Sequence, residues 1–246
     1  MQRRSLTARV AAALGVAALL LAVGGVAAAR FGFTSPFAGF RIFGLGFLLA
    51  PLGQILGVVG LVRSRGGADP TGREAAWVGL VASSVVAFSV LVVALPAARL
   101  PAINDITTDP ADPPEFRHAA REAANRGRDL SYPGGAVAEA QRAAYPDLAP
   151  IELPAPPEEA FRRAMATAEA LGWTIVYRDP EAGILEANDT SALFRFVDDI
   201  AVRIRPAPGG SVVDIRSRSR DGRGDLGANA RRIRRFRDLL RAPPAP

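Results

Sequence analysis

The residues best suited to chemistry lie late in the chain, between positions 214 and 229. Their pattern predicts a strand with alternating arginines, then a glycine-rich turn, then the start of a helix. Guanidinium groups beside such a turn and a helix N-terminus can hold an anion such as a lipid phosphate. The preceding strand adds two arginines. The candidate anion-binding residues are therefore Arg203, Arg205, Arg216, Arg218, Arg220, Asp225 and Asn229.

A structural role explains the same residues. Arginines on a sheet face pair with acidic residues across the sheet, and Asp225 or Asn229 can cap the last helix. The acidic partners available are Asp189, Asp199, Asp214 and Glu186. Anion binding instead predicts that Arg216→Ala or Arg218→Ala abolishes binding while the protein stays folded.

Metal-ion or nucleophilic chemistry has little support. Aspartates can ligate a hard cation, but their spacing here matches no EF-hand loop, and aspartate is common at turns. His118 is the single histidine, and the chain has no cysteine and no G-x-S-x-G motif, so no activated nucleophile is indicated. We expect no metal, no cofactor and no catalytic residue. The aspartates considered are Asp105, Asp109, Asp112, Asp198 and Asp199.

The last predicted helix, from about Leu226 to Leu240, has a basic face. This face either contacts anionic head groups or is solvated, with cations placed favourably near the helix C-terminus. Both interpretations stay open. Its arginines are Arg231, Arg232, Arg234, Arg235, Arg237 and Arg241.

A predicted antiparallel sheet positions these side chains. Period-2 alternation places Ile200, Val202 and Ile204 on one face and the arginines on the other. A helix opened by Pro157, and the last helix, supply apolar stripes to cover the apolar face. The fold class is α+β: three N-terminal transmembrane helices, then a small antiparallel sheet with helices packed on one face. The strands are expected at 151–153, 173–178, 183–188, 193–197, 200–205 and 212–219.

Residues 99–150 form an irregular, proline-rich arm ahead of this domain. Spaced apolar residues such as Phe116 and Tyr132 argue against a pure linker. Short helices are expected at about 117–126 and 137–144. We predict the soluble domain at 151–241 and a disordered tail at 242–246.

Residues 1–98 form a membrane domain. Its three apolar runs each have about the 20 residues that a helix needs to cross a bilayer. Gly53, Gly57 and Gly60 suit close helix packing, either among the chain's own spans or in a dimer. The sequence leaves the oligomeric state open. The spans are predicted at 10–29, 42–62 and 76–95.

The first span also resembles a secretory signal peptide. Arg3, Arg4 and Arg9 precede it, and Ala27 and Ala29 form an A-x-A pattern. Its apolar stretch is long for a signal peptide, so we predict a retained helix.

Arginine placement predicts the orientation. The N-terminal tail and the loop between the second and third spans are the more basic segments, and basic loops stay in the cytoplasm. Residues from about 100 onward are then outside. We predict a multi-pass protein of the inner (cytoplasmic) membrane with an extracytoplasmic, periplasmic domain in the cell envelope.

The net charge of +6 follows the same division. Residues 1–99 hold nine arginines and two acidic residues, whereas residues 100–246 hold 21 arginines and 22 acidic residues. The excess positive charge therefore lies in the membrane part of the chain, where it indicates the orientation of the spans. A nearly neutral soluble domain argues against nucleic acid as a partner.

Several motifs resemble the bacterial domain-of-unknown-function family 1499. They are INDITTD with PPEF (103–116), AYPDL (144–148), the Gly172-Trp173 pair and SVVDIRSRSRDGRGDLGANARRI (211–233). The resemblance covers nearly all of residues 101–241. It implies an envelope-associated or membrane-anchored protein and supplies no catalytic residues.

The sequence therefore predicts a non-catalytic binding or envelope-assembly module. Its expected partners are the lipid bilayer and an anionic lipid or other envelope component. The alternative is an enzyme acting on an anionic envelope ligand through Asp and Arg residues of the 198–229 region. A deep pocket lined by Asp198, Asp199, Arg216 and Asp225 would favour the enzyme. A fully ion-paired sheet face would favour the module.

Overall fold

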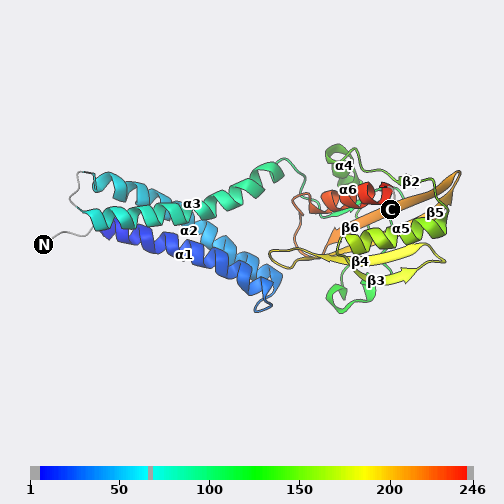
Figure 1. The fold of residues 1–246 in the computed structure, drawn as a ribbon, viewed down its shortest axis with the longest axis horizontal. Coiled ribbons are helices and arrows are strands. Elements are labelled where there is room, and N and C mark those ends of the chain that lie inside the picture. Colours follow the sequence, from blue (N-terminus) through cyan, green and yellow to red (C-terminus); the bar gives the residue numbers. More distant parts are fainter. Residues whose placement is uncertain (1–5, 66–68, 243–246) are drawn as a thin grey trace. The chain divides into compact units, whose positions relative to one another are not determined.

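A computed structural model describes residues 6–65 and 69–242 (Figure 1). The chain divides into two compact units, residues 1–98 with 192–195 and residues 99–191 with 196–246. Each unit has its own cluster of buried apolar side chains. Arg3 and Arg4 of the predicted basic tail, and residues 243–246 of the predicted disordered tail, lie outside the described residues.

The membrane unit consists of helices α1 (Leu6–Arg30), α2 (Pro36–Arg63) and α3 (Pro70–Ala97). All three are long and apolar enough to span a membrane, as predicted. Prolines are the first residues of α2 and α3. Proline is tolerated there because the first N–H groups of a helix have no acceptor within the helix. Ser35 and Asp69 cap the two helices by accepting the N–H groups of Ala38 and Gly72.

Glycines bring the three helices together. A Cβ at Gly53 would lie 2.1 Å from Ser83 Oγ of α3, and one at Gly57 would lie 3.0 Å from Leu80 Cβ of the same helix. A Cβ at Gly60 would lie 2.9 Å from the Cβ of Ala76. The glycine face of α2 is therefore buried against this chain's own helices, which accounts for its small-residue spacing.

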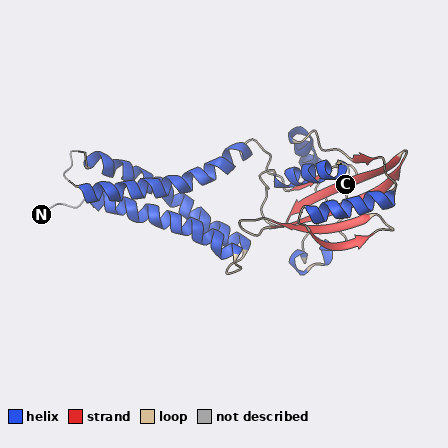
Figure 2. Ribbon diagram, viewed as in Figure 1, coloured by secondary structure: helices blue, strands red, loops and turns tan. Residues whose placement is uncertain are grey.

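The soluble unit is built on an antiparallel sheet, whose strands are red in Figure 2. The strand order is β1-β6-β5-β4-β3, with β2 also paired to β6. β5 and β6 form the long central hairpin, in which Ala207 pairs with Gly210. The strands are β1 (Asp105–Thr107), β2 (Ile151–Leu153), β3 (Thr174–Asp179), β4 (Ile184–Thr190), β5 (Val197–Ala207) and β6 (Gly210–Ser219).

The helices α5 (Pro157–Ala170) and α6 (Ala228–Arg241) cover the apolar face of the sheet (Figure 1). Ile200, Val202 and Ile204 are buried in the core with residues of both helices, as the alternation predicted. Trp173 stacks on Phe236 of α6, with ring centroids 5.3 Å apart. The predicted α+β class is confirmed.

The opposite, polar face is covered by the arm. Phe116 and Ala119 of the arm pack against Ala201 of β5. Helix α4 (Gly135–Ala144) lies beside β1, because the side chain of Gln141 pairs with the backbone of Thr107 as a neighbouring strand would. Residues 99–150 are thus part of the soluble unit and contribute β1 to its sheet.

Two local predictions were wrong. The expected strand at 193–197 is mostly a turn between β4 and β5, and Arg195 there has a φ of +64°. Short apolar runs flanked by polar residues do not by themselves distinguish a strand from a turn. The expected helix at 117–126 is instead two short 3₁₀ turns, η1 (Ala119–Arg121) and η2 (Ala123–Asn125).

Candidate anion-binding site

Arg216 lies at the centre of the polar face and is only 2% exposed. Its Nε and Nη2 donate to the two carboxylate oxygens of Asp105 at 2.8 and 2.7 Å. A two-point guanidinium–carboxylate pair of this kind is strong and strictly oriented. It joins β6 to β1 by side chains as well as by backbone bonds.

The arm encloses the same guanidinium. Arg216 also donates to the carbonyl oxygens of Pro114, at 3.2 Å, and Leu130, at 2.9 Å. The rings of Phe116 and Tyr132 flank it, with centroids 4.6 and 5.5 Å from the Arg216 Cζ atom. Burial, with Asp105 adding to it, raises the pKa of Tyr132. The central arginine is therefore occupied by the protein's own groups.

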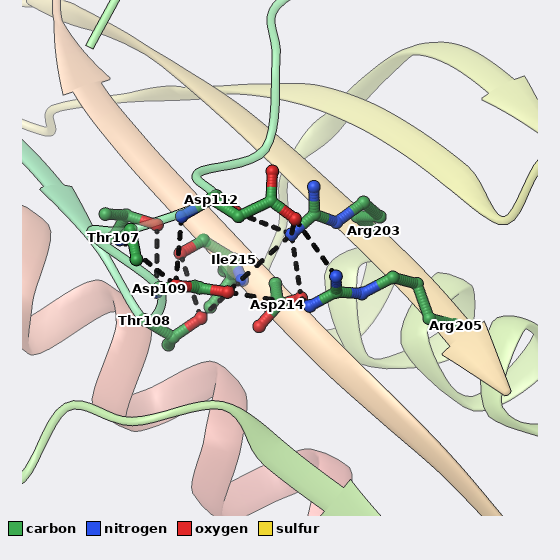
Figure 3. A network of polar contacts seen from close by, with 9 residues as sticks. Thr107, Thr108, Asp109, Asp112, Arg203, Arg205, Asp214 and Ile215 are labelled. Atoms are coloured by element: carbon green, nitrogen blue, oxygen red, sulfur yellow. Dashed lines mark hydrogen bonds and ion pairs between the residues drawn. The ribbon is translucent and has the colours of Figure 1, made fainter. Parts of the chain in front are cut away.

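A second network joins Arg203 and Arg205 of β5 to three aspartates (Figure 3). Oδ2 of the fully buried Asp214 accepts from Arg203 at 3.1 Å and from Arg205 at 2.7 Å. Asp112 of the arm lies 3.1 and 3.0 Å from the two guanidinium groups. Burial by itself would lower the pKa of Arg203, but its bonds to Asp214 and Asp112 raise it overall.

Threonines hold the arm at this network. Thr108 Oγ1 accepts the N–H of Ile215 at 2.9 Å, and Thr107 Oγ1 accepts the N–H of Asp109 at 3.2 Å (Figure 3). Asp109 lies 3.5 Å from Arg205. The arm is therefore fixed by backbone, hydroxyl and carboxylate groups together.

Arg218 is the least compensated of the predicted arginines. Its Nη1 donates to the carbonyl of Ser131 at 3.3 Å and lies 3.7 Å from Asp105, which Arg216 already engages. Its Nε is buried without a hydrogen-bond partner among the described residues. Burial is the main reason that the pKa of Arg218 is lowered, with Arg216 and Arg128 contributing repulsion.

Arg220 directly follows the C-terminal end of β6. Its guanidinium binds the carboxylates of Asp199 on β5 and Glu122 of the arm, with Nε 3.1 Å from each Asp199 oxygen. Asn125 donates to the same Asp199 at 3.0 Å. These bonds outweigh burial and raise the pKa of Arg220.

Asp225 and Asn229 lie at the start of α6. Asp225 accepts the N–H groups of Gly227 and Asn229 at 2.8 and 2.7 Å, which is a capping role. The Asn229 side chain is buried and accepts from Ser217 at 2.7 Å. Ser217 lies on the opposite face of β6 from Arg216. Asp225 and Asn229 are therefore on the other side of the sheet from the predicted arginines of β6.

Arg232 of α6 forms a further buried network on that second face. It donates to Asp198 at 2.6 Å and to Asp189 at 2.7 Å. Burial raises the pKa of Asp198, although Arg232 opposes this effect. Of the other arginines on the predicted basic face, Arg234 and Arg237 pair with Asp147.

Glu186 is a buried residue whose contact with the arm was not predicted from the sequence. Its carboxylate accepts the backbone N–H groups of Arg117, His118 and Ala119, each at 2.8 Å. His118 stacks on Tyr177 of β3. A single acidic residue at an alternating strand position carries no sequence signal for this contact, because its partners are backbone atoms 67 to 69 residues away.

The soluble unit has an open pocket of about 460 Å³ at the end of β1 and α4. Asp109, Gln141, Arg142 and Tyr145 contribute to its lining, together with several prolines. Asp198, Asp199, Arg216 and Asp225 are not among its lining residues. The pocket and the predicted arginine cluster are thus different places on the domain.

The chain thus combines three helices that are long and apolar enough to span a membrane with one α+β unit, an arrangement compatible with a membrane-anchored protein. The chain belongs to the family described as "Protein of unknown function (DUF1499)", whose model matches residues 105–240. The match begins at β1 and ends in α6, so it includes most of the arm and the whole sheet that the arm covers. No curated protein matches this sequence.

Proposed function

We propose that the protein is a non-catalytic module that is anchored in the inner (cytoplasmic) membrane. Its α+β domain lies outside the cytoplasm and binds or assembles a component of the cell envelope. One observation carries this proposal: the polar face of the sheet is closed by the arm, and its central residue Arg216 is 2% exposed. A face filled with the protein's own ion pairs suits a rigid binding module.

An enzyme working through the 198–229 region is the less supported alternative. Such an enzyme needs its acidic and basic groups at a cavity that a substrate can enter. Asp198, Asp199 and Arg216 are buried and engaged with other protein groups. The open pocket of the soluble unit is lined by other residues.

The orientation is testable because the chain has no cysteine. Single cysteines at Ala111, in the arm, and at Thr71, at the start of α3, are both in exposed positions. With a membrane-impermeant maleimide on intact cells, we expect labelling of the Ala111→Cys variant only. Thr71→Cys should react after permeabilisation. Labelling of Thr71→Cys alone in intact cells would reverse the proposed orientation.

We further propose that the module's ligand is anionic and is held by Arg218. Of the five predicted arginines, Arg218 has the weakest compensation: its carboxylate partner, Asp105 at 3.7 Å, is the one that Arg216 engages at 2.7 Å. Its Nε, like that of Arg203, is buried without a partner among the described residues. Arg128 lies close enough to repel it. An added anion would relieve this repulsion, as guanidinium groups bind phosphate or carboxylate strongly.

Binding to vesicles with and without an anionic phospholipid tests this assignment. Arg218→Ala should weaken the anion-dependent part of binding by the full-length protein, whereas Arg235→Ala, which removes an exposed α6 arginine, should not. Equal melting temperatures of the two variants would show that folding is unaffected. Equal binding by both variants would remove Arg218 from the proposal.

A further inference from the structure

The membrane unit has an apolar groove of about 440 Å³ between α1 and α3. One wall is a stripe on α1 that includes Leu19, Val23, Val26 and Ala27 at three- and four-residue spacing. Val85, Val86 and Ser89 of α3 form the opposite wall, and Phe43 of α2 also contributes. The groove is therefore lined by hydrocarbon along nearly its whole length.

The groove exists because α3 packs tightly on α1 along its first half only. A Cβ at Gly79 would lie 2.4 Å from the backbone of Ala11, so the two helices are in direct backbone contact there. Val86 is the last buried residue of α3. Farther along, Phe88 and Val92 are 66% and 55% exposed, and Figure 1 shows this part of α3 diverging from α1 and α2.

Arg30 is the charged residue of the groove, at the C-terminal end of the α1 stripe. No ion pair or side-chain hydrogen bond joins it to the other described residues. An arginine at the end of a membrane-spanning helix extends its guanidinium to the head-group region while its stem lies along apolar surface. There, the available counter-charge is a lipid phosphate.

We propose that the groove binds one acyl chain of an anionic phospholipid and that Arg30 holds its head group. Water is a poor occupant of an apolar groove that opens sideways in a bilayer. From Leu19 to Arg30 the stripe rises about 16 Å, comparable to a long part of an acyl chain. The chain and the head group are recognised by adjacent parts of one groove, which favours a whole lipid over a free anion.

The test uses full-length protein reconstituted with equal amounts of phosphatidylglycerol and phosphatidylethanolamine, then re-extracted in mild detergent. Mass spectrometry measures which lipid stays bound. The native protein should retain phosphatidylglycerol preferentially, and Arg30→Gln should reduce this preference roughly fivefold, as one arginine near an anionic head group contributes. Arg41→Gln is the matched control, because Arg41 is exposed and is not among the groove-lining residues.

A second variant tests the apolar part of the site. Ala27→Phe fills the groove and should reduce retention of both lipids while the Arg41→Gln control retains them. Excess inorganic phosphate should not displace the lipid. Equal retention of the two lipids by the native protein, or equal behaviour of Arg30→Gln and Arg41→Gln, would overturn the proposal. Arg218→Ala should leave this retention unchanged, which separates the groove from the proposed ligand site of the soluble unit.

Discussion

Arg216 and Asp105 form a buried two-point ion pair, with N–O distances of 2.8 and 2.7 Å and exposures of 2% and 1%. The two residues are 111 positions apart in the chain. The pair fastens the arm to the central strand β6, so an apparently irregular segment becomes a layer of the fold. Its charges also explain why one face of the sheet is polar although little of it meets solvent.

Replacing only one residue of this pair should strongly destabilise the protein. Asp105→Asn leaves the Arg216 cation without its carboxylate in a buried place, which costs about 3–5 kcal/mol. We expect a large fall in the melting temperature of the detergent-solubilised protein. Replacing both residues with apolar ones, as in Asp105→Leu with Arg216→Met, should restore part of the loss. An unchanged melting temperature for Asp105→Asn would contradict the buried pair.

Glu186→Gln should loosen the arm at η1. The glutamate accepts three backbone N–H groups, whereas a glutamine offers one acceptor oxygen and places an N–H₂ group against a donor. An unsatisfied buried donor costs about 1–3 kcal/mol. Hydrogen exchange of the amides at 117–119 should accelerate by a corresponding factor. Glu181→Gln, at an exposed position before β4, should leave those amides unchanged.

We expect the ion pairs of Asp147 to make the protein less stable in acid. Hydrogen bonds from Arg234, and then from Arg237, hold the pKa of its carboxyl well below the usual range. A group whose pKa is lower in the folded state stabilises the protein above its unfolded pKa of about 3.9. That contribution disappears as the pH falls through the folded pKa.

Asp147→Asn should therefore lower the melting temperature at pH 7 and matter progressively less below about pH 4. Because the side chain is 43% exposed, we expect an effect of only about 0.5–1 kcal/mol. Asp221→Asn, at an exposed position after β6, is the matched control. A deficit that persists undiminished at pH 2–3 would show that the ion pairs are not its cause.

Gly15→Ala should separate α1 from α3. The added Cβ would lie 2.5 Å from the carbonyl oxygen of Gly79, a backbone atom. Overpacking of this kind costs about 1–3 kcal/mol. Gly24→Ala in the same helix meets nothing within 4 Å and should be neutral or stabilising, since alanine favours helix. Thermal unfolding in detergent distinguishes the two variants.

Much of the fold follows from local patterns. Period-2 alternation correctly assigned Ile200 and Val202 to the core face, and unbroken apolar runs identified the three membrane-capable helices. The three-residue strand β1 was not predicted, because its pairing with β6 depends on residues more than 100 positions away. The turn at 193–197 was mistaken for a strand for a related reason. Only hydrogen bonding to a neighbouring strand distinguishes a strand from a turn in so short a segment.

The candidate anion-binding residues show where sequence reasoning stops. Alternation correctly placed Arg216 and Arg218 on one face of β6, and Arg220 directly follows that strand. It did not show that Arg216 and Arg220 are bound by Asp105 and Asp199, or that Arg218 keeps an unpartnered Nε. These differences depend on distances between distant parts of the chain.

The sequence by itself determined the three apolar spans, the unequal charge of the two halves and the alternating faces of the strands. Each depends on residues that are near neighbours in the chain, where helix and strand geometry fix the relation. The tertiary structure decided what covers the arginines. Because the arm folds over the polar face, charges that suggested an open anion site became mostly internal ion pairs, with Arg218 the least compensated.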